Sequence, residues 1–325
     1  MRIDGDVLVR LYEPVKEVHT ARPALIFFHG GGMMYGNTEI YHVLTQHLAI
    51  ELDAVLLSVG HRYSWQSPYP AALEDSTKAT VWFMHHIHKY NVDASRIAII
   101  GDSAGGNLAA AVTQRLTFNE EFADLPTLKF NALLYPGLQA FDFLTPSFQQ
   151  HGAKPSSIAT KEFITFCYSY YVIGNDGLKE AFYYNTHTSP EAKSIYSKFL
   201  SHDMIPQKFK QNGYEPPKNK TYGNEEIYRD IEKILVHPDA APLLREDLKG
   251  LPSTYIVTVE QDPLRDDGII YRQRLKDAGV SVTWKHYEKG IHGMFQLFID
   301  PFSIEAGKQS VQDLIEYANY QFYRK

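Results

Sequence analysis

The sequence predicts an α/β fold built on a mostly parallel, doubly wound sheet. Short apolar runs typical of buried strands, such as residues 24–29 and 54–59, alternate with longer segments of helical spacing, such as residues 39–52 and 71–90. Strands that alternate with helices favour parallel pairing. The chain has 325 residues and is 44% hydrophobic, so it can bury a sizeable core. Length alone allows one large domain or two small ones, and we interpret residues 1–325 as one domain.

Most elements are predicted from apolar spacing. In residues 39–52 the apolar positions 40, 43, 44 and 48 repeat as on one face of a helix. The apolar run at residues 131–135 is ended by Pro136 and Gly137. Strands are expected at residues 6–12, 24–29, 54–59, 97–101, 131–135, 254–259 and 281–286, and helices at residues 39–52, 71–90, after Ser103, and at 160–173, 264–278 and 303–323.

One region breaks this alternation. Residues 141–245 contain no clear strand, although residues 160–173 have helical spacing and residues 209–224 are polar. A segment of about a hundred residues is too long for a plain loop. We therefore expect a mainly helical cap inserted at about residues 141–245, over the carboxyl edge of the sheet, where ligands bind in folds of this kind.

Composition narrows the classes of partner and site. The net charge of −6 and the isoelectric point near 6.2 argue against nucleic acid or an anionic membrane as the main partner. The single cysteine, Cys167, cannot form an internal disulfide or supply a cysteine-based metal site on its own. The N-terminus lacks the apolar region of a signal peptide, and no apolar run reaches the roughly 18 to 20 residues of a membrane span. We expect the chain as written to be soluble and cytoplasmic.

The segment at residues 97–109, IAIIGDSAGGNLA, carries a catalytic signal. An apolar strand ends at Gly101, Ser103 follows, and a run of small residues predicts a helix. This is the strand–turn–helix context that a G-x-S-x-G nucleophile elbow requires. Gly101 and Gly105 would let strand and helix approach, while the tight turn strains the serine backbone at the helix N-terminus. A glycine-rich turn in a parallel sheet is the alternative interpretation.

An activated serine needs a base and an orienting carboxylate. Asp262 follows the predicted strand at residues 254–259, and His292 follows the strand at 281–286 within the sequence GIHG. Both can therefore reach the end of the sheet where Ser103 lies. The order serine, acid, histidine is that of α/β-hydrolases. The chain has fourteen histidines, and a glycine-flanked one after a late strand is a better candidate base than the rest.

A run of glycines follows the strand at residues 24–29. Backbone N–H groups of successive glycines can converge on one point because no side chain blocks the approach. We expect Gly31, Gly32 and Ala104 to donate to an oxyanion, with His29 and Gly30 supporting the loop. A phosphate cradle is the competing interpretation, but no Lys-Ser/Thr follows as in a P-loop, and the G-x-G-x-x-G spacing is absent there.

Four motifs occur along the chain in the same order as in a known family. HGGG at residues 29–32, GDSAGG at 101–106, DPLRDDG at 262–268 and GIHG at 290–293 resemble the hormone-sensitive lipase family of serine esterases. GDSAGGNLAAAVTQ, LLYPGLQAFDFLTPSFQQ and LRDDG are similar to the group of arylacetamide deacetylase and neutral cholesterol ester hydrolase. The similarity runs from about Val7 to the C-terminus and includes the predicted cap.

The resemblance implies an α/β-hydrolase fold and hydrolysis of acetyl or lipid esters by Ser103, His292 and Asp262 through an acyl-enzyme. No metal or organic cofactor is needed for this chemistry, and the expected partner is a small, apolar ester. Enzymes of this group are usually anchored in the endoplasmic reticulum by an N-terminal helix that this sequence lacks. We therefore expect either a soluble relative or a truncated form from the lumen of that compartment, and leave peripheral membrane contact open.

Further residues are expected to shape or support the predicted site. Residues 60–65, GHRYSW, depart from the family's usual YRLAP, and Met33 replaces a usual aromatic residue. The resemblance therefore does not determine the shape of the acyl pocket. Asp102 and Asp266 are expected to hold hydrogen bonds beneath the site. Five tyrosines are expected either to line the inner face of the cap or to fill its core: Tyr168, Tyr170, Tyr171, Tyr183 and Tyr184.

Two functions from other classes remain alternatives. The same fold serves as a non-hydrolytic small-molecule binding protein in some relatives, and a related pocket can support a lyase or cyclase reaction. The presence of Ser103, Asp262 and His292 favours hydrolysis over the binding role, whereas the lyase or cyclase reaction stays an open alternative.

Overall fold

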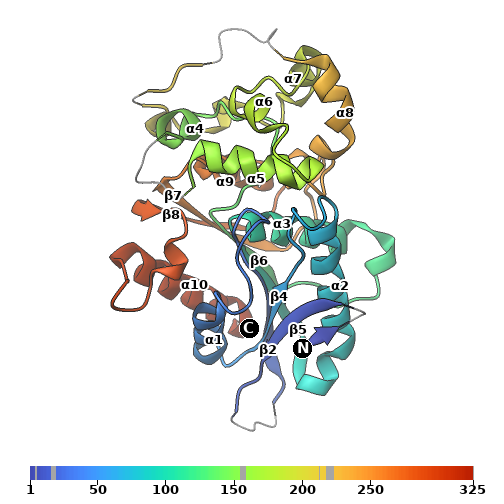
Figure 1. The fold of residues 1–325 in the computed structure, drawn as a ribbon. Helices are drawn as coiled ribbons and strands as arrows, with labels where there is room; N and C mark the ends of the chain where they lie inside the picture. Colours follow the sequence, from blue (N-terminus) through green and yellow to red (C-terminus); the bar gives the residue numbers. More distant parts are fainter. Residues whose placement is uncertain (4–5, 16–19, 154–158, 212, 217–222, 325) are drawn as a thin grey trace.

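The computed structural model describes residues 1–325 except 4–5, 16–19, 154–158, 212, 217–222 and 325. An eight-stranded sheet with helices on both faces forms its centre, which confirms the predicted α/β class (Figure 1). The strand order is β1-β2-β4-β3-β5-β6-β7-β8. The strands are β1 Arg2–Ile3, β2 Val7–Tyr12, β3 Arg22–Phe28, β4 Val55–Gly60, β5 Val92–Asp102, β6 Phe130–Leu134, β7 Ser253–Gln261 and β8 Val282–Ile291.

The sheet is parallel from β4 to β8 and antiparallel at one edge. β3, β4, β5, β6, β7 and β8 pair in parallel, whereas β2 is antiparallel to both β1 and β4. The described residues between β1, β2 and β3 form no helix that could carry the chain back for a parallel crossover. The predicted mostly parallel sheet is thus confirmed, with an antiparallel edge at β2 that the sequence did not indicate. β1, with two residues, is too short to be seen in the sequence.

The predicted helices are present with shifted ends, and four further helices, α4, α6, α7 and α8, lie within residues 141–245. They are α1 His42–Glu51, α2 Ala71–His86, α3 Ala104–Phe118, α4 Pro146–His151, α5 Lys161–Ile173, α6 Lys179–Tyr183, α7 Pro190–Tyr196, α8 Glu225–Leu235, α9 Arg265–Asp277 and α10 Glu305–Tyr323. α1 begins three residues later than predicted because the Asn37 side chain accepts from the Glu39 and Ile40 amides and forms a turn. α2 ends early in a 3₁₀ turn, Ile87–Tyr90, which Asn91 closes at φ 51°.

Alternate residues of the strands pack into two hydrophobic cores, one on each face of the sheet. In β3, Ile26 and Phe28 pack on the side of α2, α3 and α9, whereas Leu25 and Phe27 pack on the side of α1 and α10. Side chains of a strand point alternately to its two faces, so a parallel sheet with helices on both sides needs apolar residues at every position. This is why residues 24–28 of β3 form an unbroken apolar run.

Between β6 and β7 the described residues are helical or irregular and contain no strand. This stretch includes α4 to α8, which Figure 1 shows gathered beyond the sheet, with α5 next to α3. Thr160 caps α5 by accepting from the Phe163 amide, and Gly174 ends that helix at φ 77°. Among the helices of the described ranges, none has the length and apolarity to cross a membrane.

Arg265, at the start of α9, ties this helical region to the sheet. Its side chain is fully buried and forms ion pairs with Asp266 at 3.0 Å and Glu260 at 3.1 Å. It also donates to the Gln150 side chain of α4 at 3.1 Å and to the Phe209 carbonyl at 3.0 Å. One guanidinium therefore joins residues 260–266 to Gln150 and Phe209, which lie 115 and 56 positions from it in the sequence.

Replacing this guanidinium is expected to be costly. Arg265→Met should lower the free energy of unfolding by about 3–5 kcal/mol, because it leaves a buried carboxylate without its cation. Denaturant titration monitored by circular dichroism measures the change. Arg2→Met is the control, because the Arg2–Asp6 pair is exposed, and it should cost at most about 1 kcal/mol. Equal effects of the two substitutions would contradict the role given to Arg265.

Candidate active site

Ser103 lies in a strained turn between β5 and α3. Its backbone has φ 55° and ψ −119°, and its amide donates to the Leu134 carbonyl of β6 at 2.8 Å. A Cβ atom on Gly101 would collide with the Gly105 carbonyl, and one on Gly105 would collide with the Phe28 carbonyl. Glycine at these two positions therefore lets strand and helix approach and fixes the serine at the turn. The strain and the close approach expected from the sequence are both present.

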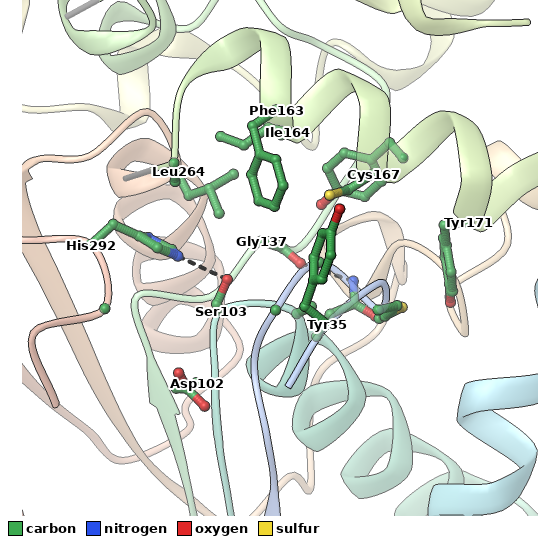
Figure 2. A pocket seen from close by; sticks show the side chains of 18 of the residues that line it. Tyr35, Asp102, Ser103, Gly137, Phe163, Ile164, Cys167, Tyr171, Leu264 and His292 are labelled. Carbon is green, nitrogen blue, oxygen red and sulfur yellow. Dashed lines mark hydrogen bonds between the residues drawn. The ribbon is translucent and has the colours of Figure 1, made fainter. Parts of the chain in front are cut away.

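Three side chains from three strand ends meet at this turn. His292 Nε2 lies 2.8 Å from Ser103 Oγ, and His292 Nδ1 lies 2.9 Å from Asp262 Oδ2. Figure 2 shows the Ser103–His292 contact beneath α5. Asp262 follows β7 and His292 follows β8, so the carboxyl ends of parallel strands bring them to Ser103. The structure thus unites the three residues predicted to carry the chemistry.

A second hydrogen bond holds the Asp262 carboxylate in place. It is fully buried, and its second oxygen, Oδ1, accepts from the Leu264 amide at 2.8 Å. Burial alone would lower the pKa of His292, but the negative charges of Asp262 and Asp102 and the hydrogen bond that His292 donates to Asp262 outweigh it, so the pKa is raised above its usual value. The site therefore favours a histidine that can accept and hold a proton.

The glycine loop after β3 faces the same point. Gly31 has φ 113° and Gly32 has φ 65°, angles that glycine adopts without strain. Within the described residues, the amides of Gly31, Gly32 and Ala104 have no hydrogen-bond acceptor in the chain. The Ala104 amide is at the N-terminus of α3, where no helical carbonyl can reach it. All three residues line the same cavity as Ser103.

A second buried carboxylate supports this loop. Asp102 Oδ1 accepts from the Gly30 amide at 2.8 Å, and Oδ2 accepts from the Tyr41 hydroxyl at 2.9 Å. Burial raises the pKa of Asp102 to about 6, although the hydrogen bonds from Tyr41 and Gly30 oppose the shift. Asp102 therefore connects the nucleophile turn to the glycine loop by hydrogen bonds, as the sequence predicts. Asp266 likewise accepts from the Ser147 amide at 2.6 Å.

His29 packs with residues 60–65 behind the loop, whereas Met33, the other departure from the family pattern, lines the cavity. The His29 and His61 rings stack at 4.3 Å, and burial, followed by the proximity of His61, lowers the pKa of His29 to about 3. His29 is therefore a neutral packing residue whose Nδ1 bonds the Gly30 carbonyl at 2.9 Å. Trp65 donates to the Met34 carbonyl at 3.3 Å, so the residues in place of the usual YRLAP contact the back of the loop.

A cavity of about 240 Å³ extends from Ser103 beneath α5. Its roof is one face of α5, formed by Phe163, Cys167 and Tyr171 at four-residue intervals, with Ile164 and Tyr168 beside them. Figure 2 shows His292 at one end of this row of residues and Tyr171 at the other. The remaining lining includes Gly31, Gly32, Met33, Tyr35, Tyr41, Asp102, Ala104, Asn107, Gly137, Ala159, Leu264 and Gly293.

The five tyrosines singled out in the sequence separate into two groups. Tyr168 and Tyr171 line the cavity, whereas Tyr170, Tyr183 and Tyr184 are not part of its described lining. Tyr170 is on another face of α5, and Tyr184 is 67% exposed beyond α6. The expectation that Tyr184 faces the cavity or the core is wrong, because α6 is a separate helix whose orientation the spacing of α5 cannot determine.

Several cavity residues are absent from the sequence prediction. Phe163, Ile164 and Cys167 belong to no motif, and only the helical spacing of residues 160–173 signals the face of α5. Leu264 lies within DPLRDDG but is not among the predicted site residues. Burial raises the pKa of the Cys167 thiol to about 12, which keeps it protonated and weakly nucleophilic. No group of three or more His, Cys, Asp or Glu side chains in the described part of the chain could hold a metal ion.

Comparisons with known proteins identify the family to which the chain belongs. The family model that matches the chain describes the α/β-hydrolase fold and covers residues 25–194 and 200–296. Arylacetamide deacetylase of Oryctolagus cuniculus is 37% identical over 296 residues, which cover 89% of this chain and 72% of the relative. Neutral cholesterol ester hydrolase 1 of Rattus norvegicus is 39% identical over 300 residues, with shares of 89% and 72%.

A solved structure leads to the same family. A thermostable esterase from Pseudomonas putida superimposes with a TM-score of 0.71 and 25% identity, covering 100% of this chain and 82% of the other. The resemblance expected from the four motifs is thereby confirmed over most of the chain. The chain belongs to the α/β-hydrolase fold family and is a carboxylesterase-type hydrolase similar to arylacetamide deacetylase and neutral cholesterol ester hydrolase.

Proposed function

We propose that this chain hydrolyses carboxylic esters through an acyl-enzyme formed on Ser103. The observation that carries the proposal is the continuous contact from Ser103 Oγ to His292 at 2.8 Å and from His292 to Asp262 at 2.9 Å. His292 accepts the Ser103 proton as the oxygen attacks the ester carbonyl, and Asp262 orients the ring and stabilises its charged form. The raised pKa of His292 favours this proton transfer.

Three backbone amides complete the proposed mechanism. The N–H groups of Gly31, Gly32 and Ala104 donate to the oxyanion of the tetrahedral intermediate, a role supported by their lack of acceptors in the described chain. His292 then protonates the departing alcohol, which leaves the acyl group on Ser103. A water molecule, deprotonated by His292, attacks the acyl-enzyme, and collapse of the second intermediate releases the acid and restores Ser103.

The substrate class follows from the lining of the cavity. Phe163, Ile164, Met33 and Leu264 are apolar, which supports an apolar acyl or alcohol group, as in acetyl or lipid esters. We propose that the helices of residues 141–245 act as a cap, because α5 covers Ser103 and would exclude water from the bound ester. Location in the cytoplasm or the endoplasmic reticulum lumen, and peripheral membrane contact, stay predictions.

Hydrolysis of p-nitrophenyl esters from acetate to long acyl chains tests the proposal. The protein should release p-nitrophenol, and Ser103→Ala should lower kcat/KM by about 10³-fold or more, because the nucleophile is lost. Circular dichroism checks that the variant is folded. Equal rates for the two proteins on every chain length would contradict the proposal and favour a binding protein. Products other than acid and alcohol would favour a lyase or cyclase.

The pH dependence tests the roles of His292 and Asp102. His292 must be neutral to accept a proton, so kcat/KM should fall as the pH drops through its raised pKa, with the acidic limb above pH 6.5. Asp102→Asn removes a negative charge that raises this pKa, so the limb should move to lower pH. Asp124→Asn, at an exposed position, is the control and should leave the limb in place. If the acidic limb of kcat/KM has the same position in Asp102→Asn as in the native protein, the proposed effect of Asp102 on the pKa of His292 is contradicted.

A further inference from the structure

Tyr135, directly after β6, packs against the proposed base, and the proposed mechanism gives it no role. Its ring centroid lies 4.8 Å from that of His292, with an angle of 54° between the ring planes. β6 lies between β5, which ends at Asp102, and β7, which Asp262 follows. Tyr135 is fully buried and is not part of the described lining of the cavity. Any effect of Tyr135 on the reaction therefore passes through His292.

The backbone of Tyr135 is strained. Its φ is 37°, and its amide donates to the Val257 carbonyl of β7 at 2.8 Å, which holds this conformation in place. A bulky residue rarely adopts a positive φ, whereas glycine does so without strain. A tyrosine at this position therefore costs stability, and such strain occurs where a side chain has a functional role.

The Tyr135 side chain is held at its hydroxyl and along its ring. The hydroxyl donates to Asp102 Oδ2 at 3.5 Å, the same oxygen that accepts from the Tyr41 hydroxyl at 2.9 Å. The Phe295 ring contacts the tyrosine ring edge-on, with centroids 5.9 Å apart. Burial, followed by the negative charge of Asp102, raises the pKa of Tyr135 well above its ordinary value, so the hydroxyl stays a donor. The ring is thus a fixed surface beside the imidazole.

His292 needs such a support more than its two partners do. Ser103 and Asp262 follow strands inside the sheet, whereas His292 follows β8, which lies at the edge of the described sheet. The next residue, Gly293, has φ 83°. The negative charge of Asp102 also acts on the imidazole, which forms its hydrogen bond with Asp262. An imidazole that turned toward Asp102 would leave both Asp262 and Ser103.

We propose that Tyr135 is a positioning residue that holds the His292 imidazole in the orientation joining Asp262 to Ser103. Its ring packs against the imidazole and limits its rotation, and its hydroxyl occupies Asp102 Oδ2. This inference rests on the proposed ester hydrolysis by Ser103. It gives the end of β6 a role in the same reaction as the ends of β5, β7 and β8.

Three substitutions separate the parts of this side chain. Tyr135→Gly relieves the positive φ but removes the ring, Tyr135→Leu keeps much of the volume without a planar ring, and Tyr135→Phe removes only the hydroxyl. With p-nitrophenyl acetate, kcat should fall by about 10-fold to 100-fold in Tyr135→Gly and Tyr135→Leu, because the base is displaced. KM should stay within about threefold, since the cavity is unchanged. Tyr135→Phe should keep kcat within about threefold of the native value.

Proton NMR gives a second readout that does not depend on turnover. The Nδ1 proton that His292 shares with Asp262 is strongly deshielded, and its signal is identified by its loss in His292→Gln. We expect this signal in the native protein and in Tyr135→Phe, and its shift or loss in Tyr135→Leu, because the hydrogen bond with Asp262 is disturbed.

Tyr255→Leu is the matched control. Tyr255 is another fully buried tyrosine of the same core, and its ring packs against Tyr317 with centroids 4.7 Å apart. This substitution should lower the thermal midpoint through lost packing, yet leave kcat within about threefold and the His292 signal in place.

Three results would overturn the inference. One is a folded Tyr135→Gly or Tyr135→Leu protein with kcat within about threefold of native or with an unchanged His292 signal. Another is a Tyr135→Phe protein as impaired as Tyr135→Leu, because the ring would then not suffice. The third is an equal loss of kcat in Tyr255→Leu, which would indicate a general effect of core packing. Failure of the proposed function differs from all three, because the native protein itself would then show no Ser103-dependent hydrolysis.

Discussion

Close packing of β5 against the start of α3 is the constraint on which the rest of the molecule depends. The backbones of Phe28, Gly101 and Gly105 approach so closely that a side chain at either glycine would collide with a neighbouring carbonyl. The chain therefore turns within two residues and holds Ser103 at a positive φ. Because β5 lies between β3 and β6, this turn is flanked by the glycine loop on one side and by Gly137 on the other.

A parallel sheet gathers residues that are distant in the sequence. Ser103 and His292 are 189 positions apart, yet they follow β5 and β8, whose carboxyl ends share one edge. Asp262, after β7, arrives at the same edge. Each of these side chains is placed by the end of a buried strand rather than by a long loop, and such strands are held on both faces by the two cores. The proposed chemistry thus uses the rigid part of the fold.

The interior beneath the cavity is unusually rich in carboxylates. Asp102, Asp262, Asp266 and Asp267 are all nearly inaccessible to solvent, and burial raises the pKa of Asp267 to about 7 despite hydrogen bonds from Gln139 and Leu138. Each accepts hydrogen bonds, and Arg265 supplies a buried cation beside Asp266. Such groups cost stability unless they are paired, so their concentration here indicates that they order the loops around Ser103.

The sequence by itself determined the α/β class and the residues that meet at Ser103, because apolar periodicity and glycine-dependent turns are local properties of the chain. Tertiary structure decided the rest. The antiparallel edge at β1 and β2 depends on connections whose described residues form no helix. The position of Tyr168 beside Gly137, with Tyr184 in solvent, depends on how α5 and α6 pack. These contacts join segments far apart in the chain, and residue spacing within one helix carries no information about which neighbour it will meet.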